Sequence, residues 1–354
     1  MRVADEQLSL QVQEILRAWG MSAEHARITA ERLRHADMRG IDSHGVALMP
    51  LYAQLRAEGR IEFRPEIGIV RESPVIALID GGHSLGQVPS TQAMQLAIDK
   101  CRRAGLAAVA VRNSNHYGAA GAYALMAAEA GLIGLAFTSV WNAAIVPTFG
   151  ADPMFGTNPI AFAAPGGRHP VFYLDMATST VAIGKLKLAA LHGRPLEPGW
   201  ALDATGQVIT DPKAALETRR LTPLGSTRAL GSHKGYGLAA MVEILCTMLT
   251  GAWYAPTRDA RHAGERHFNI GHFFLAIDPT AFRGPGEFES DLDDMIDALH
   301  TCGRADPAQP VLVAGDPEAI AMAERRQLGV PVPEALLAQL RSIAAECGAA
   351  WLLG

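Results

Sequence analysis

The sequence predicts an α/β fold in which helices cover a sheet. Between about residues 67 and 191, short apolar runs bounded by turn residues alternate with segments of helical periodicity, a pattern typical of layered α/β proteins. The chain has 354 residues, of which 49% are hydrophobic and 19% charged. This composition is typical of a compact enzyme rather than a disordered or fibrous chain. A chain of this length is expected to form two subdomains.

The first sixty residues are expected to be helical. Apolar residues recur at helical spacing at the start of the chain, namely Leu8, Val12, Ile15 and Leu16. A second helix is expected from Ser22, a favourable N-cap, to His35. A third is expected over 46–58 and stops at Gly59.

From about residue 67 the period becomes that of strands and helices in turn. The expected strands are 67–70, 75–79, 106–111, 132–138, 160–163, 171–174 and 273–277. The expected helices are 91–104, 121–130, 181–191, 237–249, 289–299, 317–327 and 333–347. Residues 193–232 are rich in Gly, Pro, Asp and Thr without sustained periodicity, so we expect a long surface excursion there.

Composition also limits the partners and the compartment. The net charge is −5 without a basic cluster, which argues against nucleic acid or an anionic membrane as a partner. The start of the chain lacks the apolar core of a signal peptide, and the least polar segment, 118–138, is interrupted by Glu129. The four cysteines are far apart and form no C-x-x-C pair, as expected of reduced thiols. We therefore expect a cytoplasmic protein.

Five short stretches place chemically capable residues beside glycines. They are G-I-D-S-H-G (40–45), N-S-N-H-Y-G (113–118), G-T-N-P (156–159), L-D-M-A (174–177) and G-S-H-K-G-Y-G (231–237). Glycine lets a backbone approach a ligand closely, and imidazole moves protons near neutral pH. Five such stretches in one chain predict an enzyme with a composite active site.

Two histidines are candidates for proton transfer. His44 follows Asp42 and Ser43 at a loop-to-helix junction; it is either a hydrogen-bonded turn residue or a base whose tautomer is fixed by Ser43 and whose pKa is tuned by Asp42 or Asp175. His116 follows a predicted strand, where α/β folds usually bind ligands. Its alternative role is to cap the next helix.

The segment Gly235-Tyr-Gly-Leu-Ala-Ala240 has the form G-x-G-x-x-A but follows no buried strand, so it lacks the context of a dinucleotide-binding fingerprint. Amides at the start of this helix, with Lys234, can hold a phosphate; the alternative is a tight packing turn with a solvated lysine.

Metal and serine-hydrolase chemistry have little support. His262, His267 and His272 are spaced by five residues, which places neighbours on different faces of a helix or strand, and no acidic or cysteine ligands accompany them. No metal ligand is therefore assigned. No G-x-S-x-G elbow is present.

The ordered series D-S-H-G-V, N-S-N-H-Y-G-A-A-G, G-T-N-P-I-A, D-M-A and H-K-G-Y-G-L resembles the malate/L-lactate dehydrogenase family with the non-Rossmann fold, over about residues 5–335. The resemblance implies a mixed-sheet cofactor domain over 67–304. It also implies a helical subdomain in which 1–66 packs with 305–354. The expected activity is that of an NAD- or NADP-dependent oxidoreductase acting on small 2-hydroxy acids, 2-oxo acids or cyclic imino acids, as a homodimer with the active site near the subunit interface.

The resemblance also implies roles for single residues. His44, with Ser43 beside it, corresponds to the proton donor or acceptor, and His116 to the acid/base residue of some members; Asp175 is grouped with them. Leu48, Tyr52 and Thr157 are assigned to the substrate. The residues assigned to the nicotinamide cofactor are Val171, Tyr173, Leu174, Asp175, Met176, Ala177, His233, Lys234, Gly315 and Asp316.

One position departs from the family pattern. Many members read S-H-G-x-x-R, whose arginine binds an acidic substrate, but Leu48 stands at that position here, and an apolar side chain cannot pair with a carboxylate. Either another cation such as Arg39 or Arg228 substitutes, or the substrate presents an apolar or uncharged group. A monocarboxylate or cyclic imino acid is therefore favoured over malate. A catalytically silent relative that binds cofactor or metabolite is the alternative, with a metal-dependent hydrolase third.

Overall fold

The computed structural model describes residues 1–354 and is built around one mixed seven-stranded sheet of order β2-β3-β4-β10-β5-β6-β7. Its strands are β2 (Gly68–Glu72), β3 (Ile76–Asp80), β4 (Leu106–Ser114), β5 (Ile133–Thr138), β6 (Ile160–Ala164), β7 (Phe172–Met176) and β10 (Ile270–Ile277). Only β3 and β4 pair in parallel. Strand β10, late in the chain, lies antiparallel between β4 and β5. The mixed α/β class predicted above is confirmed.

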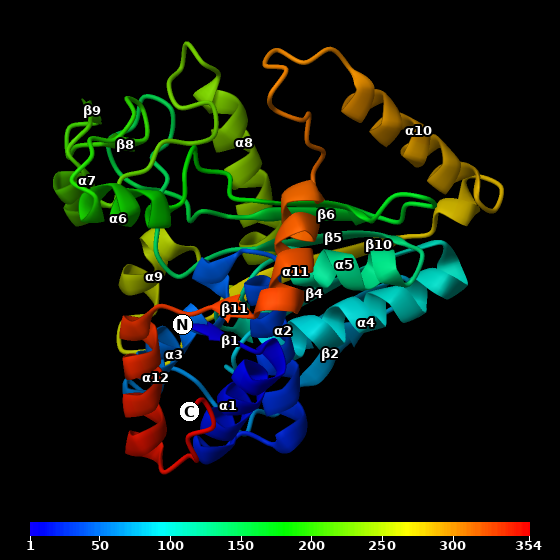
Figure 1. Cartoon of the computed structure of the whole chain (residues 1–354). Helices are drawn as coiled ribbons and strands as arrows, with labels where there is room; N and C mark the ends of the chain where they lie inside the picture. Colours follow the sequence, from blue (N-terminus) through cyan, green and yellow to red (C-terminus); the bar gives the residue numbers. More distant parts are fainter.

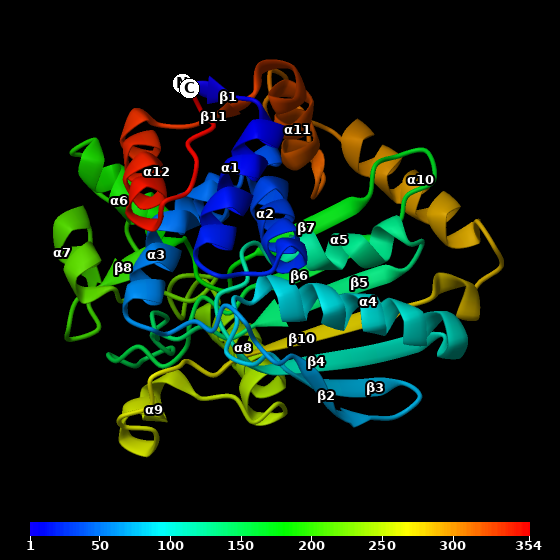
Figure 2. The ribbon, with the colours of Figure 1, turned by 90° about the horizontal axis from the view of Figure 1, so that it is seen from below.

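Helices cover both faces of this sheet. Helices α4 (Gln87–Ala104) and α5 (Gly121–Glu129) lie on the face seen in Figure 2, and α8 (Ser232–Glu243) lies on the other, above the sheet in Figure 1. The alternation of side chains along β10 shows why, since neighbouring residues point to opposite faces. Phe274 belongs to the core under α4 and α5, whereas Phe273 packs beside Cys246 in the helical turn that follows α8.

A second core joins the two ends of the chain. It is formed by α1 (Asp5–Ala18), α2 (Ala23–Met38), α3 (Met49–Ala57) and α12 (Glu334–Cys347). The short strands β1 (Arg2–Val3) and β11 (Val330–Pro331) pair antiparallel beside it. Leu85 and Phe268, from the middle of the chain, also enter this core. Division of the chain into domains at residues 66/67 and 304/305 stays a prediction.

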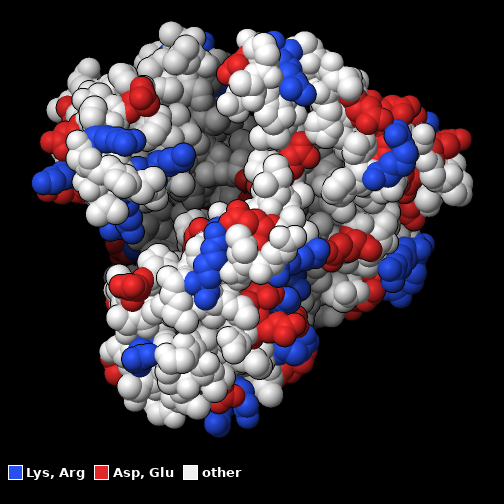
Figure 3. All heavy atoms as spheres, viewed as in Figure 1, with Lys and Arg blue, Asp and Glu red and all other residues white.

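The segment after β7 is more ordered than expected. Helix α6 (Ile183–Leu191), strands β8 (Ala201–Leu202) and β9 (Val208–Ile209) and helix α7 (Pro212–Thr218) share a small core of their own. The expectation of an unstructured surface excursion over 193–232 was therefore wrong in part, because short elements leave too few turns for a periodic pattern. In Figure 3 a deep hollow separates this lobe from the part of the molecule that carries α11 (Asp316–Leu328).

Several boundaries also differ from those predicted. Strand β4 continues to Ser114, and the helix expected from residue 237 begins at Ser232 and ends in a π-helix, η3 (Ile244–Met248). Helix α9 (Ala255–Arg261) and the 3-10 turn η4 (Pro279–Ala281) had no predicted counterpart. None of the helices is long and apolar enough to cross a membrane.

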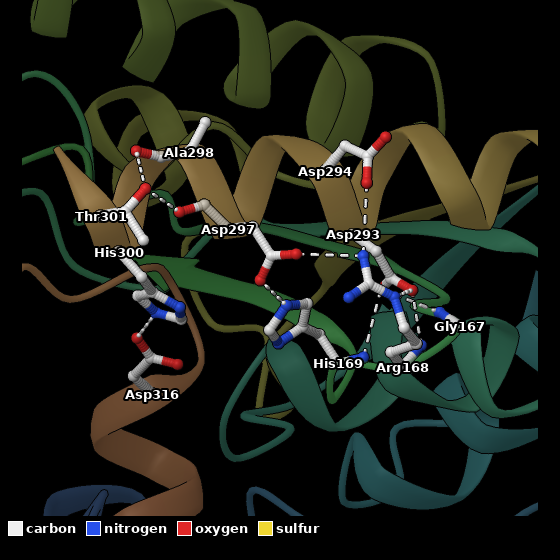
Figure 4. Close-up of polar contacts among 10 residues, drawn as sticks. All are labelled: Gly167, Arg168, His169, Asp293, Asp294, Asp297, Ala298, His300, Thr301 and Asp316. Atoms are coloured by element: carbon white, nitrogen blue, oxygen red, sulfur yellow. Dashed lines mark hydrogen bonds and ion pairs between the residues drawn. The ribbon is translucent and has the colours of Figure 1, made fainter.

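Helix α10 (Glu287–Thr301) is attached to the β6–β7 turn by polar contacts (Figure 4). The Asp293 carboxylate accepts hydrogen bonds from the amides of Gly167, Arg168 and His169, at 3.1, 2.6 and 3.2 Å. These bonds hold the pKa of Asp293 below its usual value. The attachment places α10 and the segment after it beside the edge strand β7.

Candidate active site

A small cavity of about 40 Å³ brings together residues from three of the five motifs, from the end of β5 and from β10. Its lining combines imidazoles, hydroxyls and aromatic rings: His44, His116, Tyr117, Gly118, Thr138, Ser139, Val140, Trp141, Thr157, Pro159 and Ile270. The rings of His44 and His116 stack with centroids 5.8 Å apart. Of the predicted site residues, the structure thus brings His44, His116 and Thr157 to one cavity.

The segment before His44 is anchored through its carboxylates. A 3-10 turn, η1 (Asp42–His44), carries the histidine. Buried Asp37, at the end of α2, accepts a hydrogen bond from the Val46 amide at 2.9 Å. Glycine is required at position 45, because a Cβ there would lie 1.8 Å from the Asp37 carboxylate. The Asp42 carboxylate forms an ion pair with Arg325 of α11, so it is turned to the helical core rather than to His44.

His44 has one polar partner, the Ser43 hydroxyl, with 2.8 Å between Oγ and Nδ1. Burial lowers the pKa of His44 below its ordinary value, and no carboxylate opposes this shift. The expected tuning by Asp42 or Asp175 is therefore absent. The ring is neutral at neutral pH, and its Nε2 is free of protein partners.

A chain of hydrogen bonds fixes the ring of His116 through its Nδ1 atom. Gln87 donates to the Tyr52 hydroxyl at 2.7 Å, and that hydroxyl lies 3.1 Å from His116 Nδ1. The Gly118 amide donates to the same nitrogen at 3.3 Å. Since Nδ1 accepts, the neutral ring carries its proton on Nε2. Burial and the neighbouring His44 and His272 lower the pKa of His116 to about 3.

Tyr52 therefore supports His116 rather than lining the cavity. Replacing Tyr52 with phenylalanine removes the hydroxyl that fixes the imidazole and leaves the buried Gln87 amide without its acceptor. We expect about a tenfold loss of kcat, with about 1–2 kcal/mol of lost stability. Steady-state kinetics and urea unfolding measure the two effects. An unchanged kcat would show that the His116 tautomer does not matter.

Thr157 enters the cavity because its loop is tied to α8. Asn158 is buried with a φ of 34°, and its amide donates to the Ala239 carbonyl at 3.0 Å and to Glu243 Oε2 at 2.7 Å. On the other side, the Thr178 amide donates to the Thr157 carbonyl at 2.9 Å. The G-T-N-P loop is thus held from both sides, with Thr157 in the lining of the cavity.

The D-M-A motif ends strand β7, at the edge of the sheet. The Asp175 carboxylate accepts from the Gly121 amide at 2.7 Å and so caps α5. Burial raises the pKa of Asp175 to about 6. Its charge acts on Tyr117 and Tyr173 rather than on His44. The structure gives this predicted catalytic residue a capping contact, outside the lining of the cavity.

Leu174 and Met176 alternate with Tyr173 and Asp175 along β7 and so face the opposite side of the sheet. Val171 and Ala177 flank the strand. Beside it, the Tyr173 amide donates to the Ala314 carbonyl at 3.1 Å, which brings the turn at Gly315 and Asp316 to the β7 edge. The Asp316 carboxylate itself pairs with His300 at 2.7 Å.

The H-K motif lies in the first turn of α8, where His233 and Lys234 are exposed. Gly235 packs closely on the loop before the helix, since a Cβ there would lie 2.3 Å from the Leu224 carbonyl. The first glycine of G-x-G-x-x-A is thus a packing residue, as in the simpler alternative. Arg228 donates to His233 Nδ1 at 2.9 Å and does not reach the cavity.

No lysine or arginine lines the cavity. Leu48 is buried in the helical core, so it forms no wall of this site. Arg39, considered above as a substitute cation, lies in another cavity against Tyr173. Arg258 lies behind the lining, where its Nη1 donates to the Trp141 carbonyl at 2.6 Å.

Sequence reasoning missed the hydroxyl and aromatic residues of the lining. Trp141 packs edge-on against His116 at 5.8 Å, and Thr138 Oγ1 lies 2.7 Å from Nδ1 of the buried His272. Tyr117 Oη is buried without a hydrogen-bond partner. Thr138 and Ser139 follow directly from a predicted strand end, the same signal that selected His116, and this signal could have found them.

The three histidines considered for a metal are dispersed. His272 is enclosed in the sheet between Ser114 and Thr138, His262 stacks on Trp253, and His267 stacks on His83. No group of three histidine, cysteine or acidic residues is arranged to hold an ion.

Comparison with known proteins places this geometry in a family. The family model described as malate/L-lactate dehydrogenase matches residues 3–341. The chain belongs to the malate/L-lactate dehydrogenase family. It is 39% identical to the malate dehydrogenase of Pyrococcus abyssi, over 98% of this chain and 95% of that protein. It is 37% identical to the L-sulfolactate dehydrogenase of Methanothermobacter thermautotrophicus, over 98% and 97%.

The fold agrees with this assignment. The crystal structure of malate dehydrogenase from Entamoeba histolytica matches with a TM-score of 0.94 at 30% identity, covering 99% of both chains. The protein is thus a dehydrogenase of the malate, sulfolactate and hydroxycarboxylate class, which acts on 2-hydroxy acids, and its family implies a nicotinamide cofactor. Membership in this family of enzymes favours a working dehydrogenase over the silent relative and the metal-dependent hydrolase considered above.

Proposed function

We propose that the protein is an NAD- or NADP-dependent dehydrogenase that transfers a hydride between nicotinamide and C2 of a small 2-hydroxy acid, 2-oxo acid or cyclic imino acid. His44 exchanges the accompanying proton with the oxygen or nitrogen on that carbon. The observation that carries the proposal is the pairing of two neutral imidazoles, 5.8 Å apart, with the Thr157 hydroxyl around one cavity.

The residues beside the cavity fit a nicotinamide cofactor. Tyr117 lines the cavity, and its buried hydroxyl makes no hydrogen bond within the protein. Such a group is stabilised by a polar ligand atom. The start of α8 presents backbone amides that suit a phosphate. The edge of β7, from Val171 to Ala177, is the segment we assign to the nucleotide ribose. We assign Lys234 to the phosphates or ribose. When bound, the cofactor supplies or accepts the hydride.

The chain itself supplies positioning and proton transfer. In the oxidation direction, neutral His44 accepts the proton of the substrate hydroxyl through Nε2, because Ser43 occupies Nδ1. His116, fixed with its proton on Nε2, donates a hydrogen bond to the same oxygen or to the carboxylate. Trp141 packs on His116 and excludes water from that side.

The lining also bears on the substrate. A dicarboxylate needs two anion-binding contacts, and a cavity of about 40 Å³ without lysine or arginine offers only hydroxyls and imidazoles. These contacts suit one carboxylate better than two. We therefore favour a monocarboxylate or a cyclic imino acid over malate as the preferred substrate.

The test is oxidation of NADH and of NADPH, followed by absorbance, against a panel of 2-oxo acids and cyclic imines. The proposal expects turnover with at least one member, and a kcat/KM for the best monocarboxylate or cyclic imine above that for oxaloacetate. Preference for oxaloacetate would overturn the substrate argument alone. Cofactor binding without turnover on the whole panel would overturn the proposed function.

The low pKa of His44 gives a pH signature. Burial favours the neutral ring, so the base needed for oxidation is present from its lowered pKa upward. We expect kcat/KM for oxidation of the 2-hydroxy acid to be flat above pH 7 and to fall only below pH 6.5, the ordinary pKa of histidine. A pH-rate profile measures this. A midpoint at or above pH 6.5 would contradict a buried imidazole base.

We also propose that the protein is a homodimer with the active site near the interface. The outer face of α8 and η3 is apolar, with Met241, Ile244, Met248 and Leu249 from 39 to 60% exposed. Such a row is unusual on a monomer, and the same helix holds the Thr157 loop. Light scattering is expected to give twice the chain mass, and Met248→Glu to shift it toward the monomer. A monomeric wild type would exclude this arrangement.

A further inference from the structure

A second cavity, of about 320 Å³, lies between α2, α5 and α11, apart from the His44 site. Its lining is strongly basic. It includes Arg32, Arg34, His35, Arg39 and Arg326, with Glu31 and Glu129 as the acidic members. No motif discussed above accounts for this cluster.

Three of the four arginines have no carboxylate partner. Arg34 forms an ion pair with Asp5, and Glu31 is engaged by Arg27. Arg32 donates from Nη1 to the Ala122 carbonyl at 3.1 Å, while its Nε is buried and makes no hydrogen bond. Arg39 and Arg326 form no ion pair either. The lining therefore carries four guanidinium groups against two carboxylates, of which Glu31 is already paired with Arg27.

Arg39 is a partly buried cation of this cavity that forms no ion pair. Its guanidinium lies 5.8 Å from the Tyr173 ring centre, and Nη1 is 3.2 Å from His35 Nδ1. Burial holds the pKa of His35 well below its usual value, so this imidazole is neutral and accepts the hydrogen bond. Burial also lowers the pKa of Arg39. Glu129 and Glu318 favour the charged guanidinium but form no ion pair with it. A partly buried cation without a direct anionic partner is destabilising unless an anion compensates it.

Of the residues assigned to the cofactor, only Tyr173 contacts residues of this cavity. Tyr173, which contacts His35 at 3.1 Å, points to the α5 side of β7. Leu174 and Met176 point to the other side. Lys234, at the start of α8, also belongs to that opposite side. The basic cavity therefore lies on the side of β7 opposite to Leu174, Met176 and Lys234.

We propose that this cavity binds a small multivalent oxyanion, a phosphorylated or polycarboxylate metabolite, held by Arg32, Arg39 and Arg326. Guanidinium groups pair with the oxygens of phosphate and carboxylate in a planar fork, and groups from two helices can hold a ligand between them. Helix α2 runs from the cavity to the His44 turn, and Arg325, next to Arg326, pairs with Asp42 of that turn. A bound anion would reinforce the same α2–α11 contact that anchors His44.

The test is isothermal titration calorimetry of the full chain with inorganic phosphate and with citrate, at constant ionic strength. Three glutamine variants are compared with wild type: Arg39→Gln, Arg326→Gln and, as a matched control, Arg103→Gln at the exposed end of α4. We expect saturable binding that weakens at least tenfold in the first two variants and is unchanged in the third. Arg326 is exposed, so its variant folds even if Arg39→Gln does not.

A fourth variant, Lys234→Gln, separates this cavity from the cofactor site. Binding that persists in Lys234→Gln supports the proposal, and its loss there would assign the anion to the cofactor site and overturn it. Absence of saturable binding, or equal binding by wild type and both cavity variants, would also overturn it. A higher affinity for phosphate than for citrate indicates a phosphorylated ligand. A higher affinity for citrate indicates a polycarboxylate. None of these readouts depends on the dehydrogenase reaction.

Discussion

Replacing His44 with alanine is expected to reduce turnover by about a hundredfold or more, while the affinity for the cofactor stays nearly the same. The imidazole is neutral, its Nδ1 is held by the Ser43 hydroxyl, and its Nε2 is free to accept the substrate proton. Its removal takes away the proton acceptor, whereas the residues assigned to the nucleotide lie on β7 and α8. Steady-state kinetics and cofactor titration by fluorescence measure the two quantities.

The control for this variant is His192→Ala, which removes an exposed imidazole at the end of α6. It is expected to retain wild-type kcat. Turnover of His44→Ala at the wild-type rate would remove His44 from the mechanism. Loss of cofactor binding together with activity would instead assign His44 a structural role.

Gly271→Ala is expected to destabilise the fold by about 3 kcal/mol or more, because it overpacks a closed site. A Cβ at this position in β10 would lie 1.6 Å from the Cys246 carbonyl in the π-helix η3. A backbone carbonyl cannot rotate away as a flexible side chain can, so β10 and η3 must move apart to admit the new methyl group. The Gly271 carbonyl also accepts from the Ser139 amide at 3.1 Å, which carries the disturbance to the cavity wall.

The matched substitution is Gly184→Ala in α6, where a Cβ meets no atom within 4 Å. Alanine is favoured over glycine in a helix by up to about 1 kcal/mol, so this variant is expected to be as stable as wild type or slightly more so. Urea unfolding measures both variants. Equal stability of Gly271→Ala and wild type would show that β10 and η3 are not in the contact described.

The site residues that could be predicted are those marked by a short sequence motif. His44 and His116 stand in short glycine-flanked motifs beside predicted strand or helix ends, and the cavity contains both. The roles of Asp42 and Asp175 could not be predicted, because their partners, Arg325 and Gly121, are distant in sequence. A carboxylate near a histidine in sequence need not face it in space.

The fold shows the same limit. Strands and helices with clear periodicity were predicted within a few residues, whereas the insertion of β10 between β4 and β5 is a long-range pairing that no local pattern encodes. The π-helix η3 was predicted as ordinary helix, since its apolar pattern continues that of α8. The cytoplasmic location stays a prediction.

The most direct test of the account is a crystal structure of the protein with bound nicotinamide cofactor. The account predicts the nicotinamide ring in the cavity between His44 and Thr157, with His44 Nε2 about 3–4 Å from the substrate oxygen or from the water that takes its place. A nicotinamide ring bound elsewhere, with His44 and His116 remote from it in both subunits, would contradict the account.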